Sequence, residues 1–238
     1  MLGRADVEYD RLMMQLDSLT GEAADLGEQT LGFKGPSLAY RKIEGLEIDG
    51  LFRSWVQHAV AADICRRIYG EGVPVATFRS MFMNKPAEAG TPLSWHQDRW
   101  AWLDRDPLVT IYTALDAATV ANGCVHVIAG SHHSLVNPWD DSAFLDEAHY
   151  RQHCPPEREV ALEMGSGDVV LLHNWLIHRS GVNRSELPRR AFSVCYMDAR
   201  TIDLLGRTYP VVFDSEGRAT SLDESTPSAF PFFRGPEQ

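Results

Sequence analysis

Cysteine is scarce in this sequence of 238 residues, which contains four: Cys65, Cys124, Cys154 and Cys195. No two of them form a Cys-x-x-Cys pair. Disulfide scaffolds and zinc fingers need denser and more regularly spaced cysteines. This usage favours reduced thiols, and we therefore expect a cytoplasmic protein.

Positive charge and long apolar runs are also lacking. Lys and Arg total 22 against 33 Asp and Glu, which gives a formal net charge of -11. Nucleic acids and anionic membranes are bound through basic surfaces, so neither is an expected partner. No apolar run approaches the roughly 20 residues of a membrane span. The first ten residues carry Arg4, Asp6, Glu8 and Asp10, which is not typical of a signal peptide.

Internal repeats, low-complexity tracts and Gly/Ser linkers are absent as well. A chain of this length can bury a sizeable core without disulfides or structural metals. The sequence thus predicts a single domain over residues 1–238. Its parts are a mostly helical segment (1–72), a β-rich core (73–214) and a C-terminal tail (215–238).

The N-terminal segment has helical periodicity. Apolar residues recur at intervals of three and four between Tyr9 and Leu19, and again between Gly50 and Gly70. The second stretch predicts one helix that ends at Gly70, with Arg66 and Arg67 in its last turn. We expect its apolar stripe to pack against the rest of the fold.

From Val73 onward, short runs rich in Val, Ile, Thr and aromatic residues alternate with turn residues. The predicted strands are Val73–Met83, Leu108–Leu115, Val125–Ile128, Val160–Leu162, Val169–Leu172, Arg190–Tyr196 and Tyr209–Phe213. Many short strands separated by such turn residues are typical of an antiparallel sandwich or barrel. Residues 131–158 are too long for a turn and form either a lid-like excursion or an irregular surface insertion.

Metal-binding chemistry is indicated by His96 and Asp98. Residues i and i+2 of a strand point to the same side, so the imidazole and the carboxylate can converge. Together they make two-thirds of the facial triad that holds non-haem Fe(II) in oxygenases. The third ligand has two candidates, His173 and His178. His178, followed by Arg-Ser-Gly after an apolar strand, is the more ligand-like of the two.

A 2-oxo acid bound to such a metal leaves a second carboxylate, for which a guanidinium is the best partner. Arg189 and Arg190 begin a predicted strand, and their side chains must point to opposite faces. Arg189 shares its face with the small residues Ala191, Ser193 and Cys195, which suit a crowded interior. Arg190 shares its face with bulkier residues, so the pattern mildly favours Arg189.

These residues belong to a series of motifs that resembles the phytanoyl-CoA dioxygenase family of Fe(II)- and 2-oxoglutarate-dependent oxygenases. In order, the motifs are Met81-Phe-Met-Asn-Lys-Pro86, Trp95-His-Gln-Asp98, Tyr112-Thr-Ala-Leu115, Asn122-Gly-Cys-Val-His-Val-Ile-Ala-Gly-Ser-His132 and His178-Arg-Ser-Gly-Val-Asn183 with Arg189. The similarity covers about Val73 to Met197. It implies a double-stranded β-helix (jelly-roll, cupin-like) core with the N-terminal helices packed outside.

The resemblance also implies roles for individual residues. Iron would be held by His96, Asp98 and His178, and O2 would bind beside 2-oxoglutarate. Arg189 would pair with the distal carboxylate of 2-oxoglutarate, and Ser180 would donate a hydrogen bond there. Tyr112 would line the co-substrate site, and Asn84 would either contact 2-oxoglutarate or cap a turn. An aspartate at position 98 favours hydroxylation over halogenation. Arg179 departs from the small residue usual in the family and is expected to narrow or charge the site.

The expected reaction is hydroxylation of an unactivated C–H bond in a small molecule, with release of succinate and CO2. Trp102 and Arg99 are the candidate substrate contacts, suited to a small acid, an amino acid or a natural-product intermediate. The alternatives are a metal-dependent cupin-type isomerase or hydrolase and a non-catalytic small-molecule binder. The sequence does not indicate the oligomeric state.

Overall fold

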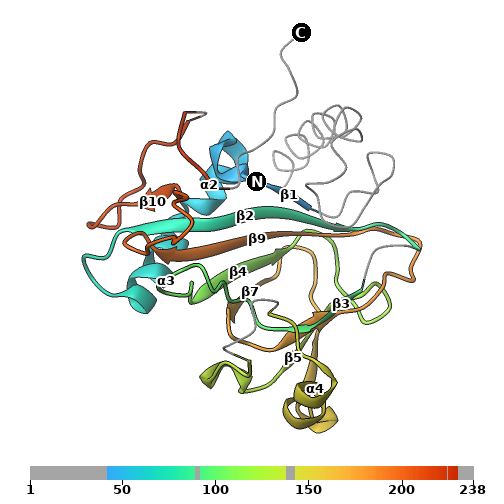
Figure 1. The fold of residues 1–238 in the computed structure, drawn as a ribbon. Helices are drawn as coiled ribbons and strands as arrows, with labels where there is room; N and C mark the ends of the chain where they lie inside the picture. Colours follow the sequence, from blue (N-terminus) through green and yellow to red (C-terminus); the bar gives the residue numbers. More distant parts are fainter. Residues whose placement is uncertain (1–41, 89–91, 138–142, 224, 230–238) are drawn as a thin grey trace.

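The computed structural model describes residues 42–88, 92–137, 143–223 and 225–229. The helix predicted between Tyr9 and Leu19 lies outside these residues. So do positions 138–142 of the predicted excursion and the last nine residues of the predicted tail. The described chain is mainly β and forms two antiparallel sheets (Figure 1).

The larger sheet has six strands. Its order is β1 (Lys42–Glu44), β2 (Val75–Lys85), β9 (Arg189–Asp198), β4 (Val109–Ala114) and β7 (Val169–His173), with β10 (Val211–Phe213) also paired to β2. Every adjacent pair is antiparallel. The long central strands β2 and β9 are buried along most of their length, which accounts for their rich content of apolar residues.

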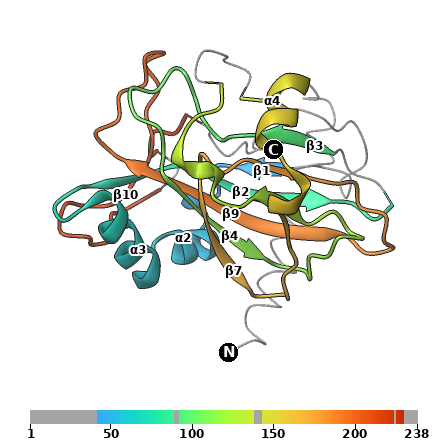
Figure 2. The ribbon, with the colours of Figure 1, turned by 90° about the horizontal axis from the view of Figure 1, so that it is seen from below.

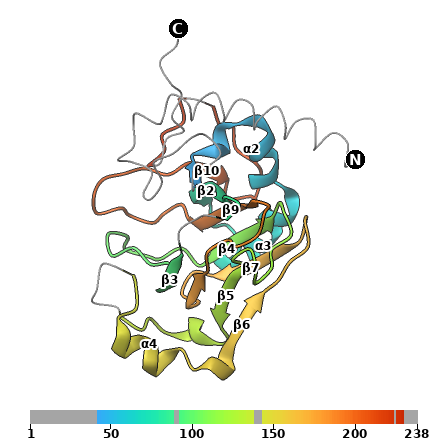
Figure 3. The same ribbon diagram turned by 90° about the vertical axis from the view of Figure 1, so that its right-hand side faces the viewer.

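The smaller sheet has the order β3 (Leu93–His96), β8 (His178–Ser180), β5 (Val125–Ile128) and β6 (Glu159–Leu162). Figures 2 and 3 show how the two sheets curl over one another. The helix α4 (Glu147–His153) lies beyond the smaller sheet, and α2 (Gly50–Val56) and α3 (Ala59–Tyr69) lie beyond the larger one. This arrangement is the double-stranded β-helix, or jelly roll, and the predicted fold class is confirmed. All seven predicted strands are present, with ends shifted by one or two residues in most cases.

The helix predicted from Gly50 to Gly70 is interrupted, and that prediction was wrong in its continuity. Two helices occur instead, α2 (Gly50–Val56) and α3 (Ala59–Tyr69), with Gln57 and His58 between them. The Gln57 side-chain amide donates to the backbone oxygens of Val212 and Thr220, at 3.0 and 2.8 Å. His58 caps α3 by accepting from the amide of Val60. Tertiary contacts therefore break a helix that the apolar periodicity would continue.

The main apolar core lies between these helices and the outer face of the larger sheet. Phe52 of α2 packs against Phe192 of β9, with 4.8 Å between ring centroids. The Tyr196 hydroxyl donates to the backbone oxygen of Val56 at 2.7 Å. Leu222 from the chain after β10 joins this core. The predicted packing of helices outside the β-core is confirmed, and it leaves the inner faces of the sheets available for a cavity.

The predicted excursion contains a short 3-10 helix η4 (Ser131–His133), the helix α4 (Glu147–His153) and a second 3-10 turn η5 (Pro156–Arg158). Asp146 caps α4 by accepting from the amide of His149 at 2.8 Å. Among the described residues, no helix is long and apolar enough to cross a membrane.

Candidate active site

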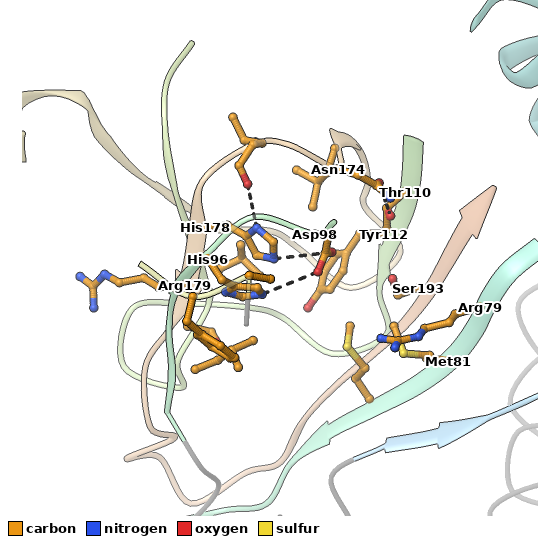
Figure 4. A pocket seen from close by; sticks show the side chains of 18 of the residues that line it. Arg79, Met81, His96, Asp98, Thr110, Tyr112, Asn174, His178, Arg179 and Ser193 are labelled. Atoms are coloured by element: carbon orange, nitrogen blue, oxygen red, sulfur yellow. Dashed lines mark hydrogen bonds and ion pairs between the residues drawn. The ribbon is translucent and has the colours of Figure 1, made fainter. Parts of the chain in front are cut away.

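Two histidines and an aspartate meet at one corner of the smaller sheet. His96 ends β3 and His178 begins β8, and the two are directly paired in the sheet register. Their ring centroids are 4.0 Å apart. Each Nε2 lies 3.8 Å from a carboxylate oxygen of Asp98. One donor atom from each of the three residues falls within 4.8 Å of the others (Figure 4).

The backbone sets the orientation of both imidazoles. Nδ1 of His96 lies 2.8 Å from the Ser94 carbonyl, and Nδ1 of His178 lies 2.8 Å from the Leu176 carbonyl. A carbonyl only accepts, so both Nδ1 atoms must carry a proton, and Nε2 is the nitrogen of each ring that faces Asp98. Burial, and next the neighbouring His178, lower the pKa of His96. His96 is therefore neutral near pH 7 and available as a ligand.

This donor set fits a divalent transition metal. Two imidazoles and one carboxylate on one side of a point form the facial triad, which leaves the opposite coordination positions open. The backbone carbonyls behind both histidines supply the outer hydrogen bonds that metal-bound histidines ordinarily make. Spacings of 3.8 Å between Nε2 and carboxylate oxygens are too long for hydrogen bonds, and they leave the three donor atoms gathered around one point.

Asp98 reaches this point by a different route from the one predicted. Strand β3 ends at His96, so alternation along a strand does not place Asp98 beside it. The chain turns instead: the Asp98 amide donates to the Asn174 carbonyl at 2.8 Å, and the Arg99 amide donates to the Gln97 carbonyl. The carboxylate is thus positioned by the segment after β7, which no local pattern reveals.

His173 is separate from the triad. It ends β7, and its Nδ1 accepts from the Trp175 amide at 3.0 Å. Its ring lies near His132, with 5.3 Å between centroids, and burial is the first cause that lowers its pKa. The structure thus brings His178, and not His173, together with His96 and Asp98.

A cavity of about 380 Å³ extends from the triad between the two sheets. Arg189, at the start of β9, is 5% exposed and lines it. Its Nη1 donates to the Tyr112 hydroxyl at 2.5 Å, and burial raises the pKa of that tyrosine. Ser180 and Asn84 also line the cavity. Asn84 lies within β2 and not in a turn, because the strand continues to Lys85.

Arg190 points the opposite way. Its guanidinium makes a two-pronged ion pair with Asp116, with both nitrogen–oxygen distances at 2.7 Å. That carboxylate also accepts from the Arg190 amide at 2.8 Å. Of the two arginines, Arg189 is therefore the one that faces the cavity.

The geometry agrees with comparisons to known proteins. A sequence model of the family described as "Phytanoyl-CoA dioxygenase (PhyH)" matches residues 15–191, which is more than half of the chain. The chain belongs to the phytanoyl-CoA dioxygenase family. Iron and 2-oxoglutarate are the cofactors of this family, which agrees with the predicted pair.

The relatives within the family are distant. A probable phytanoyl-CoA dioxygenase from Caenorhabditis elegans is 28% identical over 193 residues, covering 74% of this chain and 61% of the relative. A probable alpha-ketoglutarate-dependent hypophosphite dioxygenase from Stutzerimonas stutzeri is 27% identical over 213 residues, which cover 86% of this chain and 69% of the relative. The human peroxisomal phytanoyl-CoA dioxygenase is 30% identical over 147 residues, which cover 57% of this chain and 44% of the relative. The chain thus spans between two-fifths and seven-tenths of these proteins.

Solved structures share the fold. EctD from S. alaskensis, with 2-oxoglutarate and 5-hydroxyectoine, superposes with a TM-score of 0.60 at 22% identity, covering 94% of this chain and 79% of that one. The carbocyclase SnoK from nogalamycin biosynthesis superposes with a TM-score of 0.60 at 24% identity, covering 80% of this chain and 77% of that one. The epimerase SnoN, in complex with Fe3+, alpha ketoglutarate and nogalamycin RO, superposes with a TM-score of 0.57 at 20% identity. The superposition covers 82% of this chain and 75% of that one.

Arg179, the departure from the family pattern, does not charge the metal site. Its Nη2 pairs with Glu159 on β6, and its guanidinium lies 5.0 Å from the centre of the Trp95 ring. Figure 4 shows the side chain directed away from the triad. Because Glu159 neutralises it, the positive charge stays outside the centre of the cavity.

The two residues predicted to contact the substrate differ in their position relative to the cavity. Trp102 lines the cavity and has the Arg207 guanidinium 4.8 Å from its ring centre. Arg99 is not among the lining residues, and its role stays a prediction. From the excursion, Phe144 lies beside His96, with 5.2 Å between ring centroids, and also lines the cavity. The described part of the excursion thus borders the site.

Four residues of β2 line the cavity although the sequence did not single them out as site residues. Lys85, Met83, Met81 and Arg79 occupy alternate positions along the strand and face inward. Their period of two, counted back from the Asn-Lys-Pro motif, was the signal that could have found them.

Proposed function

We propose that this protein is an Fe(II)- and 2-oxoglutarate-dependent oxygenase that hydroxylates a C–H bond of a small molecule. In the overall reaction, the substrate C–H bond, O2 and 2-oxoglutarate give an alcohol, succinate and CO2. The observation that carries the proposal is the presence of two features in one cavity: a three-ligand metal centre and the buried guanidinium of Arg189.

His96, Asp98 and His178 would hold the iron through Nε2, a carboxylate oxygen and Nε2. When bound, iron together with 2-oxoglutarate and O2 supplies an oxidant strong enough to break an aliphatic C–H bond. The aspartate at position 98 would keep a carboxylate on the metal, which supports hydroxylation over halogenation.

Arg189 would bind the distal carboxylate of 2-oxoglutarate. Its buried guanidinium already donates to Tyr112, so the tyrosine holds it in place before the co-substrate arrives. A charge-assisted hydrogen bond in a buried site is stronger than the same contact in water. Ser180, two residues after His178, would add a hydroxyl donor, and Asn84 would complete the polar end of the cavity.

Trp102 would contact the substrate, and Arg99 stays a further candidate. The substrate would be a small acid, an amino acid or a natural-product intermediate. A single domain over residues 1–238 and a cytoplasmic location also stay predictions.

The test is an anaerobic titration of the apo-protein with Fe(II) and 2-oxoglutarate, followed by visible absorption. The weak charge-transfer band of the chelate should form in the wild type and disappear in His178→Ala. In Arg189→Ala the apparent affinity for 2-oxoglutarate should fall by at least tenfold, because the buried partner of its distal carboxylate is lost.

Arg190→Ala is the matched control, since this neighbouring arginine faces away from the cavity and should leave the band unchanged. A wild-type protein that binds the metal yet shows no band would overturn the oxygenase proposal. It would favour a cupin-type isomerase or hydrolase, for which Arg189 is not required.

A further inference from the structure

The turn between β7 and β8 touches two of the three candidate metal ligands. It runs from His173 to Leu176 and is closed by the Leu176 amide, which donates to the His173 carbonyl at 2.9 Å. The Asn174 carbonyl accepts from the Asp98 amide at 2.8 Å, and the Leu176 carbonyl lies 2.8 Å from Nδ1 of His178. The position of this turn therefore sets where Asp98 and His178 present their donor atoms.

The side chain of Asn174 fastens the turn to the larger sheet. Its Oδ1 accepts from the Thr110 hydroxyl of β4 at 2.9 Å, and its Nδ2 donates to Sγ of Cys195 on β9 at 3.0 Å (Figure 4). Thr110 and Cys195 are directly paired in the sheet register. The Asn174 amide adds a hydrogen bond to the Leu108 carbonyl at 3.2 Å. One residue thus links two strands of the larger sheet to the turn that follows β7.

Burial makes these contacts restrictive. Asn174 is 2% exposed, Cys195 is 3% exposed and Thr110 is 8% exposed. A buried polar group that loses its partner costs the free energy of its desolvation, so the Asn174 side chain has little freedom to leave this position. A buried side chain with partners on both of its polar atoms specifies one arrangement, whereas an apolar side chain of similar size only fills the space. The turn is therefore held in one place relative to the sheet.

The three candidate ligands differ in how much they depend on this turn. His96 ends β3, and its Nδ1 donates to the Ser94 carbonyl of the same strand. His178 begins β8 and is paired with His96 in the sheet register. Asp98 lies in the loop after β3, where its amide donates to Asn174. A displaced turn should therefore move Asp98 more than either histidine.

We propose that Asn174 is a positioning residue that sets the geometry of the metal site before a metal binds. It acts through the backbone of the turn, chiefly on Asp98 and secondarily on His178. This role rests on the proposed function, because it takes His96, Asp98 and His178 as ligands of one metal ion. Outer hydrogen-bond partners of metal ligands typically change metal affinity by about 10- to 100-fold when they are lost.

The test measures metal binding without turnover. Apo-protein is titrated with Co(II): calorimetry gives the affinity, and visible absorption reports the number and arrangement of the ligands. Asn174→Leu keeps the approximate volume of the side chain but removes its hydrogen bonds. Its affinity for Co(II) should fall by about tenfold or more, and the absorption of bound Co(II) should change, because Asp98 is no longer held beside the two histidines.

Variants of Thr110 and of a remote amide separate positioning from a general loss of stability. Thr110→Val removes the hydroxyl donor and should weaken Co(II) binding severalfold, whereas Thr110→Ser keeps the donor and should bind as wild type does. Gln57→Leu is the matched control, since this amide also makes two hydrogen bonds but lies between α2 and α3, away from the cavity lining. It should lower the thermal midpoint and leave the Co(II) affinity and spectrum unchanged.

Asn174 has no positioning role if Asn174→Leu binds Co(II) with wild-type affinity and spectrum, or if Gln57→Leu loses as much affinity as Asn174→Leu. Should Asn174→Leu fail to fold, the two Thr110 variants decide, and equal affinities in Thr110→Val and Thr110→Ser would overturn the proposal. Failure of the proposed function looks different: wild-type protein would bind Co(II) yet form no chelate band with Fe(II) and 2-oxoglutarate.

Discussion

At the scale of single residues, Gly123 marks a close backbone approach near the candidate metal ligands. Its φ is +77°, and a Cβ built there would lie 2.5 Å from the carbonyl oxygen of Gly181. Gly181 is three residues beyond His178. Asn122 holds the turn by accepting from the Thr119 amide and donating to the Ala117 carbonyl, each at 2.7 Å. The Asn-Gly pair therefore acts through the geometry of the turn.

Gly123→Ala should lower the free energy of unfolding by about 3 kcal/mol or more, measured by urea denaturation. A left-handed alanine costs about 1–2 kcal/mol, and the methyl group must also displace a backbone carbonyl. Gly167→Ala is the control: it has a φ of +88° but no atom within 4 Å of the added Cβ. It should lose only the backbone part, about 1–2 kcal/mol. Equal losses in both variants would show that the contact with Gly181 does not matter.

At the scale of elements, a buried carboxyl joins the 3-10 turn η3 (Leu46–Ile48) to β2. Glu47 is 2% exposed, accepts from the Ser80 hydroxyl and also from Ser228 of the chain after β10. The Glu47 amide donates to the Ser80 oxygen at 2.9 Å. Burial is the largest cause that raises the pKa of Glu47 above its ordinary value of 4.5. The hydrogen bonds oppose that effect only in part.

A raised carboxyl pKa means that the folded chain prefers the protonated form. The unfolded chain then releases this proton at lower pH, so stability declines as pH rises from the ordinary carboxyl pKa through the folded one. Glu47→Gln should therefore have a higher thermal midpoint than wild type at pH 8, with a smaller difference at pH 5. Glu157→Gln, on the exposed turn η5, should show no such trend. A midpoint difference that grows towards acid would contradict this assignment.

At the scale of the whole molecule, the candidate metal site joins segments that are distant in sequence. His96 and His178 come from neighbouring strands, and Asp98 comes from the loop between β3 and β4. Next to them, the Gln97 side chain donates to the Ser134 carbonyl and accepts from the Val136 amide of the excursion. A ligand that binds only the folded arrangement must stabilise all of these segments together.

Metal binding should therefore raise the thermal midpoint of the wild-type protein. At a free metal concentration one hundred times Kd, the stabilisation is about 2.7 kcal/mol. For a chain of this size that corresponds to roughly 5–10 °C. Differential scanning fluorimetry with Ni(II), and then with excess EDTA, measures the rise and its reversal. Asp98→Ala should abolish the shift, whereas an unchanged shift in that variant would place the metal elsewhere.

Much of the fold followed from local patterns. The strands were predictable because alternation and β-branched residues act over a few neighbours, as in Val125–Ile128, whose ends were predicted correctly. The helix between Gly50 and Gly70 was predictable in type but not in continuity, since the carbonyls that bind Gln57 lie more than 150 positions away. His96 and Asp98 were found because they are two residues apart in one motif, whereas His178, 80 positions further on, was found from the Arg-Ser-Gly that follows it and from the family resemblance.

The sequence by itself determined the mainly β class, the strand positions and a short set of residues able to hold a metal and a 2-oxo acid. Only the tertiary structure decided among them. Sheet register placed His178 opposite His96, and the ion pair with Asp116 holds Arg190 on the outer face while Arg189 points inward. The physical reason is the separation along the sequence over which each feature acts. Periodicity is a property of neighbouring residues, whereas sheet register and ion pairs depend on partners that only folding brings together.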